Sequence, residues 1–225
     1  MGRVSSLYGT SVGKKITMAV SGAIFVVFVM VHWFGNLKVF MGPEVFNHYA
    51  EGLREFGDPF LPYGWFLWIF RAGLILALII HVWTAWSLTR QSWAARGTKY
   101  KKKESLNIDA ASSTMRWGGV FLFLFVTYHI LHLTTGTLHP DFIHGDAYHN
   151  FVAGFQSIPV AVFYMVCMIA LGLHLYHGTW SAFQTLGIDG PRAQKFRRPL
   201  SLIIALVVAG GNLLFPVAVL TGFVS

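Results

Sequence analysis

Four histidines of this chain each lie inside a different long apolar stretch, at intervals of 49, 48 and 45 residues. They are His32, His81, His129 and His174. Imidazole is the commonest metal ligand in proteins. An ionisable side chain in membrane hydrocarbon normally faces the interior of a helix bundle and has a function there. Four histidines on four helices make two possible axial pairs, so the pattern predicts haem held between membrane helices.

The composition places these histidines in a membrane protein. Of the 225 residues, 55% are hydrophobic and 12% are charged, and the mean hydropathy is +0.56. Those values exclude an ordinary soluble domain. Crossing a hydrocarbon core takes roughly 20 mostly apolar residues, and the sequence contains five stretches of that kind. They cover about residues 16–40, 62–89, 117–137, 158–183 and 200–223.

These stretches leave no room for a soluble domain. We expect an all-α integral membrane protein of five transmembrane helices, forming a single transmembrane domain over residues 1–225. The first four helices would form a four-helix bundle around two haems. Cys167 is the only cysteine, which excludes covalent haem attachment through a Cys-x-x-Cys-His run, so any haem would be held by coordination and packing alone.

The basic residues indicate which side of the membrane each connection occupies. There are 17 Lys and Arg against 9 Asp and Glu. Fourteen of the 17 precede the first apolar stretch, or lie between the second and third, or between the fourth and fifth. The positive-inside rule then places the N-terminus in the cytoplasm and the C-terminus outside. This distribution favours anionic lipid or an acidic partner protein over nucleic acid as the partner of the basic face.

The depth of each histidine predicts how they pair. At about 1.5 Å per helical residue, His32 and His129 lie roughly 25 and 20 Å from the inner membrane boundary, toward the outer leaflet. His81 and His174 lie roughly 14 and 15 Å from that boundary, toward the inner leaflet. We therefore expect His32 and His129 to bind an outer haem, and His81 and His174 an inner haem. Two imidazoles fill both axial positions of each iron, which favours electron transfer over oxygen binding.

Two further histidines make the identity of one ligand in each pair uncertain from the sequence alone. His132 and His177 each follow a proposed ligand by three residues and lie on nearly the same helix face, so either could replace it. His129 is favoured because, like His32, it comes ten residues after a glycine in an internal repeat. His174 is favoured because it lies deeper in its apolar stretch. His132 and His177 would then be propionate or quinone partners, or ordinary hydrogen-bonded polar groups.

Other polar residues carry weaker signals. Arg71, in the outer half of the second helix, could pair with a haem propionate, or its side chain could extend to the membrane interface. His139, His144 and His149 recur every five residues in the outer loop. That spacing does not line one helix face, so we expect a solvated rim near a quinone entrance in preference to a metal site.

The motifs around these histidines resemble one family, the five-helix, dihaem cytochrome b558 membrane-anchor subunits of bacterial succinate dehydrogenase and fumarate reductase. The likeness spans nearly the whole chain. Its motifs are Gly13-Lys14-Lys15, His32-Trp-Phe-Gly-Asn36-Leu, Phe46-Asn47-His48-Tyr49-Ala50, Tyr128-His129, and His174-Leu-Tyr-His177-Gly followed by Trp180-Ser181-Ala-Phe-Gln-Thr-Leu-Gly187.

The resemblance implies a function in complex II, in the bacterial inner membrane. In that family helices one and three hold one haem, and helices two and four hold the other. An iron–sulfur subunit and a flavoprotein with FAD would dock on the cytoplasmic face, and menaquinone or ubiquinone would be the membrane substrate. Asn36 and His132 are candidate quinone contacts near the outer haem. The acidic residue that some relatives carry in helix two has no counterpart between residues 59 and 88.

Two other functions fit part of the pattern. A dihaem cytochrome b of a hydrogenase or formate dehydrogenase would need its soluble partner on the outer face, where the loops are acidic. A transporter or a structural anchor would use the histidines as proton relays and would bind no haem.

Overall fold

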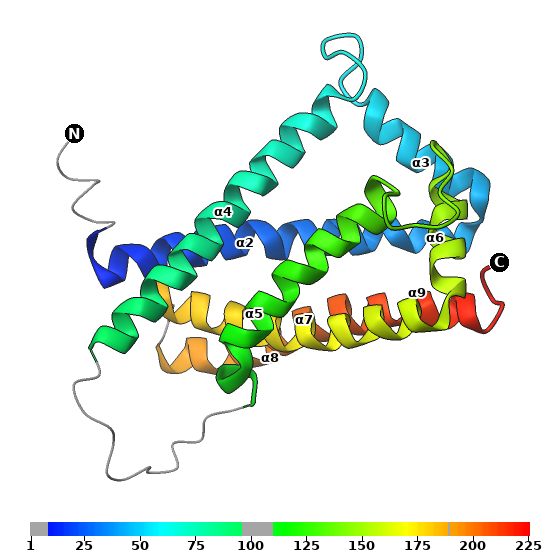
Figure 1. Cartoon of the computed structure of the whole chain (residues 1–225). Helices are drawn as coiled ribbons and strands as arrows, with labels where there is room; N and C mark the ends of the chain where they lie inside the picture. Colours follow the sequence, from blue (N-terminus) through cyan, green and yellow to red (C-terminus); the bar gives the residue numbers. More distant parts are fainter. Residues whose placement is uncertain (1–8, 96–109, 189) are drawn as a thin grey trace.

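The computed structural model describes residues 9–95, 110–188 and 190–225, and every regular element in these ranges is a helix (Figure 1). Five helical segments are long and apolar enough to cross a membrane, which confirms the predicted number. Each overlaps one of the five predicted stretches. They are Ser11–Met41, Trp65–Ala94, Thr114–Thr134, Ile158–Thr185 and Pro191–Leu220.

The first four of these segments are built mainly from single α-helices. Helix α2 (Ser11–Asn36) continues into a short 3-10 helix, η1 (Leu37–Met41). Helix α4 (Trp65–Ala94) is uninterrupted, whereas α5 (Ala110–His129) continues into one π-helical turn, η2 (Ile130–Thr134). Such turns occur frequently at functional sites, and this one begins directly after a proposed haem ligand.

The remaining spans place proline and glycine where they assist packing. Helix α7 (Ile158–Thr185) has a proline in its first turn, where the missing N–H costs no hydrogen bond. The last span consists of α8 (Pro191–Ala205), the π-helical η3 (Leu206–Gly210) and α9 (Gly211–Leu220). A Cβ at Gly211 would collide with the Trp33 indole of α2, so this helix packs closely through small residues, as expected.

Helix α7 is the centre of the bundle. It packs against α2, α5, α8 and α9, and α2 packs in addition against α4. The start of α2, the end of α4, the start of α5 and the end of α7 lie at one end of the molecule (Figure 1). The described members of the group of fourteen therefore share that end, whereas Lys38, Arg54 and Arg71 do not belong to the group. Arg3 and the basic residues from 96 to 103 lie outside the described residues, and the cytoplasmic orientation stays a prediction.

Two short helices cap the opposite end, where the sequence suggested only loops. They are α3 (Pro43–Glu55) and α6 (Ala147–Gln156). Neither is long enough to cross a membrane, and each packs on the other and on the ends of the longer helices. Their length and polar residues made them look like loops, but contacts to the bundle stabilise them as helices.

The Asn47 side chain joins these two helices. Its amide donates to Asp146 Oδ1 at 2.9 Å, and its carbonyl oxygen accepts from the Tyr148 N–H at 2.9 Å. Asp146 also caps α6 by accepting from the His149 N–H at 2.9 Å. The hydrogen bonds from the His149 N–H and the Asn47 amide hold the pKa of the Asp146 carboxyl below its ordinary value.

Candidate functional site

The four histidines meet as two pairs inside the bundle. His32 of α2 and His129 of α5 have ring centroids 5.9 Å apart, with ring planes at 90°. His81 of α4 and His174 of α7 have centroids 6.3 Å apart, with planes at 62°. These are the pairs expected from helix depth. That they bind iron stays a prediction.

The spacing within each pair fits one metal ion between two imidazoles. A metal–imidazole nitrogen distance is about 2 Å, and the ring centre lies roughly 1 Å beyond the nitrogen, so two axial rings have centres roughly 6 Å apart. Both observed separations match this value. The donor set and its spacing therefore suit the two axial positions of haem iron.

Each histidine pair joins two helices that do not pack closely against each other. Helix α2 packs on α4 and α7, and α5 packs on α7. The histidine pairs instead connect α2 with α5 and α4 with α7. In Figure 1, α4 and α5 both run obliquely to α2 and α7. A flat group inserted between the imidazoles would thus lie between helices whose backbones stand apart.

Two glycines border the inner pair. A Cβ at Gly22 of α2 would lie 3.5 Å from His81 Cε1, and one at Gly119 of α5 would lie 3.8 Å from His174 Cε1. These are the glycines that precede His32 and His129 by ten residues in the sequence repeat. Each of the two helices therefore supplies a histidine to the outer pair and a side-chain-free position to the inner pair, roughly 15 Å apart along its axis.

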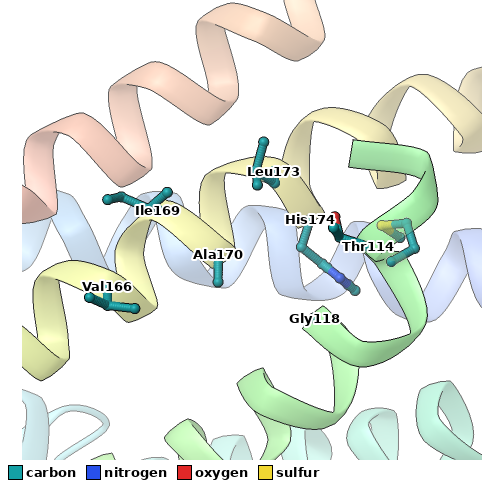
Figure 2. Close-up of a pocket in the computed structure, with 8 residues that line it drawn as sticks. Thr114, Gly118, Val166, Ile169, Ala170, Leu173 and His174 are labelled. Carbon is teal, nitrogen blue, oxygen red and sulfur yellow. The ribbon is translucent and has the colours of Figure 1, made fainter. Parts of the chain in front are cut away.

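The inner pair has one hydrogen-bonded ring and one open side. Ser21 Oγ lies 3.1 Å from His81 Nδ1, and the Ser21 hydroxyl is 2.9 Å from the Thr17 carbonyl oxygen. His174 Nδ1 finds no hydrogen-bond partner in the part of the chain that the structure describes. Figure 2 shows His174 extending from α7 toward α5, beside a pocket of about 270 Å³. The other residues that line this pocket are mostly apolar and also come from α5 and α7.

The outer pair lies among aromatic rings. The Phe28 ring stacks on His32 with centroids 5.4 Å apart, and Phe125 lies 5.8 Å from His129. The Tyr164 hydroxyl of α7 lies 3.4 Å from His129 Nδ1. The same hydroxyl lies 3.1 Å from His132 Nδ1. Aromatic rings therefore contact both histidines of the outer pair and a phenol lies beside His129, while His32 remains exposed.

The two alternative ligands occupy different surroundings from the paired histidines. His132 is 1% exposed and stacks on Tyr128 and His139, with centroids 5.3 and 4.8 Å away. His177 lies beside Trp180, with ring centroids 5.7 Å apart. The rings that face His32 and His81 are those of His129 and His174.

Arg71 and Asn36 do not join a cluster around the outer pair. The Arg71 guanidinium lies over the Trp68 ring, 5.1 Å from its centroid, and the side chain is partly exposed. Asn36 ends α2 one turn beyond His32 and is partly buried. The propionate and quinone roles suggested for them stay predictions.

The prediction of a solvated rim is wrong for His139. This residue is buried, its Nε2 lies 3.0 Å from the Asn150 carbonyl oxygen, and its Nδ1 accepts from the Asp141 N–H at 3.1 Å. The Asn150 side chain bonds both backbone groups of Ile143 at 2.7 Å and folds the loop against α6. His144 is exposed, as expected. Among the described residues, no group of three or more His, Cys, Asp or Glu side chains could hold a metal ion.

Tyr164 and Ser21 are the polar neighbours that sequence reasoning missed. A spacing signal existed for Tyr164, because it precedes His174 by ten residues just as Arg71 precedes His81. Each of the two polar residues lies ten residues before its histidine, roughly 15 Å along its helix, and so at the depth of the outer pair. Nothing in the sequence singled out Ser21.

Comparison with known proteins identifies the chain's relatives. The family model described as the succinate dehydrogenase/fumarate reductase transmembrane subunit matches residues 98–213, slightly more than half of the chain. The matched segment contains α5 and α7, and so one histidine of each pair. No curated protein and no solved structure matches significantly. The chain therefore belongs to the family of succinate dehydrogenase and fumarate reductase transmembrane subunits, and its five apolar helices make it a multi-pass membrane protein.

Proposed function

We propose that this chain is the membrane anchor and dihaem cytochrome b subunit of a succinate:quinone oxidoreductase, carrying electrons between an iron–sulfur subunit and membrane quinone. Its family is the membrane subunit of an oxidoreductase complex. The observation that carries the dihaem proposal is the presence of two imidazole pairs, each with ring centres about 6 Å apart, at two depths of one bundle.

The ligands of this proposal are His32 with His129 and His81 with His174. Haem supplies a one-electron carrier, and the protein supplies its orientation and electrostatic surroundings. Both axial positions of each iron would be filled, which excludes oxygen as a ligand. The Phe28 ring stacks on the His32 ring. The choice of His129 over His132 rests on His132 being enclosed between α6 and α7, away from His32.

The depth of the two pairs supports a path across the membrane. They are separated by roughly 15 Å along α2 and α5, so each lies in a different half of a hydrocarbon core about 30 Å thick. Electrons from a partner at the basic end would reach the inner site first. The physiological quinone, menaquinone or ubiquinone, would be reduced or oxidised in the membrane.

The basic end of the bundle is the proposed docking face for the iron–sulfur and flavoprotein subunits, with FAD and the clusters on those partners. Its arginines lie over indole rings: Arg90 over Trp86 at 4.9 Å, and Arg198 over Trp180 at 5.7 Å. Tryptophan and arginine gather in this way at membrane interfaces. An excess of positive charge favours the cytoplasmic side of the membrane, and it would attract a partner protein with an acidic surface.

Spectroscopy of the purified full chain tests the proposal. A dithionite-reduced minus oxidised spectrum with haem quantitation should give two b haems per chain, and a His129→Ala variant should give one. His144→Ala, an exposed histidine at the same end, is the matched control and should keep both. A folded wild-type chain that carries no haem, after expression with ample porphyrin, would contradict the dihaem proposal.

Copurification tests the partner. Isolation of the native complex should yield an iron–sulfur protein and a flavoprotein, and succinate should reduce the haem. Partners of a hydrogenase or formate dehydrogenase, with haem that succinate does not reduce, would overturn the succinate assignment while leaving the dihaem assignment intact.

A further inference from the structure

The Tyr164 hydroxyl bridges two histidines at the outer end of the bundle. It lies 3.4 Å from His129 Nδ1 and 3.1 Å from His132 Nδ1. Tyr164 is 5% exposed and His132 is 1% exposed, so water does not compete for these contacts. The proposed function uses His129 as a haem ligand but gives no role to the other two side chains.

Ligation of His129 through Nε2 fixes the direction of both hydrogen bonds. A neutral imidazole that binds metal through one nitrogen carries its proton on the other. His129 Nδ1–H would then donate to the Tyr164 oxygen. The phenol has a single proton, which it would donate to His132 Nδ1. In this arrangement His129 Nδ1, the phenol and His132 Nδ1 each have a partner of the correct type.

His132 is itself held in place on several sides. Its ring stacks on Tyr128 with planes at 15° and on His139 with planes at 24°. Helix α6 approaches so closely that a Cβ at Gly154 would lie 2.8 Å from His132 Cε1. His139 in turn lies within hydrogen-bond distance of the Asn150 carbonyl oxygen. The acceptor offered to Tyr164 is therefore fixed by α6, which the sequence did not predict.

We propose that Tyr164 and His132 are positioning residues for the outer haem, which orient the His129 ring and lower the midpoint potential of that haem. This inference rests on the proposed dihaem function. A hydrogen bond accepted from the second nitrogen of a metal-bound imidazole fixes the ring and makes the ligating nitrogen more basic. A more basic ligand stabilises ferric over ferrous iron, which lowers the potential.

The test is a redox titration of the full chain carrying Tyr164→Phe, which removes only the hydroxyl. The midpoint potential of the outer haem should rise by about 59 mV. For one electron, that shift corresponds to a tenfold change in the ferric/ferrous equilibrium constant. The inner-haem potential should stay unchanged. The outer haem is identified as the one missing from a His32→Ala variant.

The matched control is Tyr148→Phe at the same end of the molecule. The Tyr148 hydroxyl donates to the Ser225 carbonyl oxygen at 3.2 Å and is not hydrogen-bonded to a histidine. Both potentials should match the wild type in this variant. Equal shifts in the two variants would contradict a specific role for Tyr164.

Variants at His132 provide an independent measurement if the Tyr164→Phe variant cannot be obtained as folded protein. His132→Asn keeps an acceptor near the position of Nδ1, whereas His132→Leu removes it. The outer-haem potential should rise in the leucine variant and return toward the wild-type value in the asparagine variant. Adding His132→Leu to Tyr164→Phe should cause little further shift, because the two residues act through one hydrogen bond.

The outcomes separate this inference from the proposed function. Two haems with unchanged potentials in Tyr164→Phe, or equal potentials in the two His132 variants, would overturn the positioning role alone. Absence of haem from the wild-type chain would overturn the dihaem function itself.

Discussion

The outer and inner histidine pairs come from the same four helices but lie in different surroundings. The outer pair is contacted by Phe28, Phe125 and Tyr164, and the capping helices α3 and α6 close that end of the bundle. The inner pair borders a pocket of about 270 Å³ and leaves His174 Nδ1 without a described partner. The internal repeat relates the two histidines of one pair to each other, and it does not relate the outer pair to the inner pair, so nothing in it makes the two environments alike.

This difference has a chemical consequence. The potential of a bis-imidazole haem depends on burial and on hydrogen bonds to the ligands. The outer pair has a phenol and a second histidine behind one ligand, whereas the inner pair has the Ser21 hydroxyl. Two haems with identical ligands would therefore differ in potential.

The largest expected effect comes from removing one ligand of the inner pair. His174→Ala should abolish the inner haem and leave the outer haem, because a single imidazole cannot fill both axial positions. Haem per chain, measured from the reduced spectrum, should fall from two to one. His177→Ala is the control and should retain both. The reverse result in the two variants would move the ligand to His177.

A second way to separate the pairs uses the glycine beside His81. Gly22→Val adds a side chain at a position already 3.5 Å from His81 Cε1 and should displace the imidazole at a cost of about 1–3 kcal/mol. Inner-haem occupancy should fall and outer-haem occupancy should not. Gly73→Val, in the neighbouring helix with open space around its Cβ, matches the change in helix propensity. Equal losses in both variants would contradict a packing role for Gly22.

The capping helices provide a test of the outer pair alone. Asn47→Ala removes both hydrogen bonds between α3 and α6. The free energy of unfolding should fall by about 1–3 kcal/mol, measured by denaturant titration in detergent. The outer-haem spectrum should change before the inner one. His48→Ala, at the exposed neighbouring position, should leave stability and spectrum unchanged.

The smallest expected effect is a pH dependence at the α6 cap. Because the pKa of Asp146 is lowered in the folded chain, the carboxylate contributes stability above its unfolded pKa, which is about 3.9. That contribution is lost as the pH falls from there through the lowered value. Hydrogen exchange of α6 should accelerate over this acid range. In Asp146→Asn the acceleration should be absent, and its persistence would assign the effect to another group.

The membrane-spanning elements could be predicted from the sequence because their signal is local. An apolar stretch of roughly 20 residues is determined by the residues within it. Helix depth increases linearly with residue number, so the positions of His32 and His129 along their helices already placed them at similar heights. The pairing needed no knowledge of how the helices cross.

The capping helices and the polar neighbours of the ligands could not be predicted in this way. Asn47 and Tyr148 are 101 residues apart, and Tyr164 and His129 are 35 apart. Contacts of that kind depend on which helices pack together, and no local pattern encodes them. Short helices such as α6 gain most of their stability from such packing, which is why a polar loop was expected there.

The sequence by itself determined the five spans and the four histidines on separate helices, because hydrophobicity and helical rise depend only on neighbouring residues. The tertiary structure alone decided which of His129 and His132 faces His32, since three residues along a helix leave both on nearly one face. The packing of α6 against α7 distinguishes the two histidines, because it encloses His132 beside Tyr164 and leaves His129 facing His32.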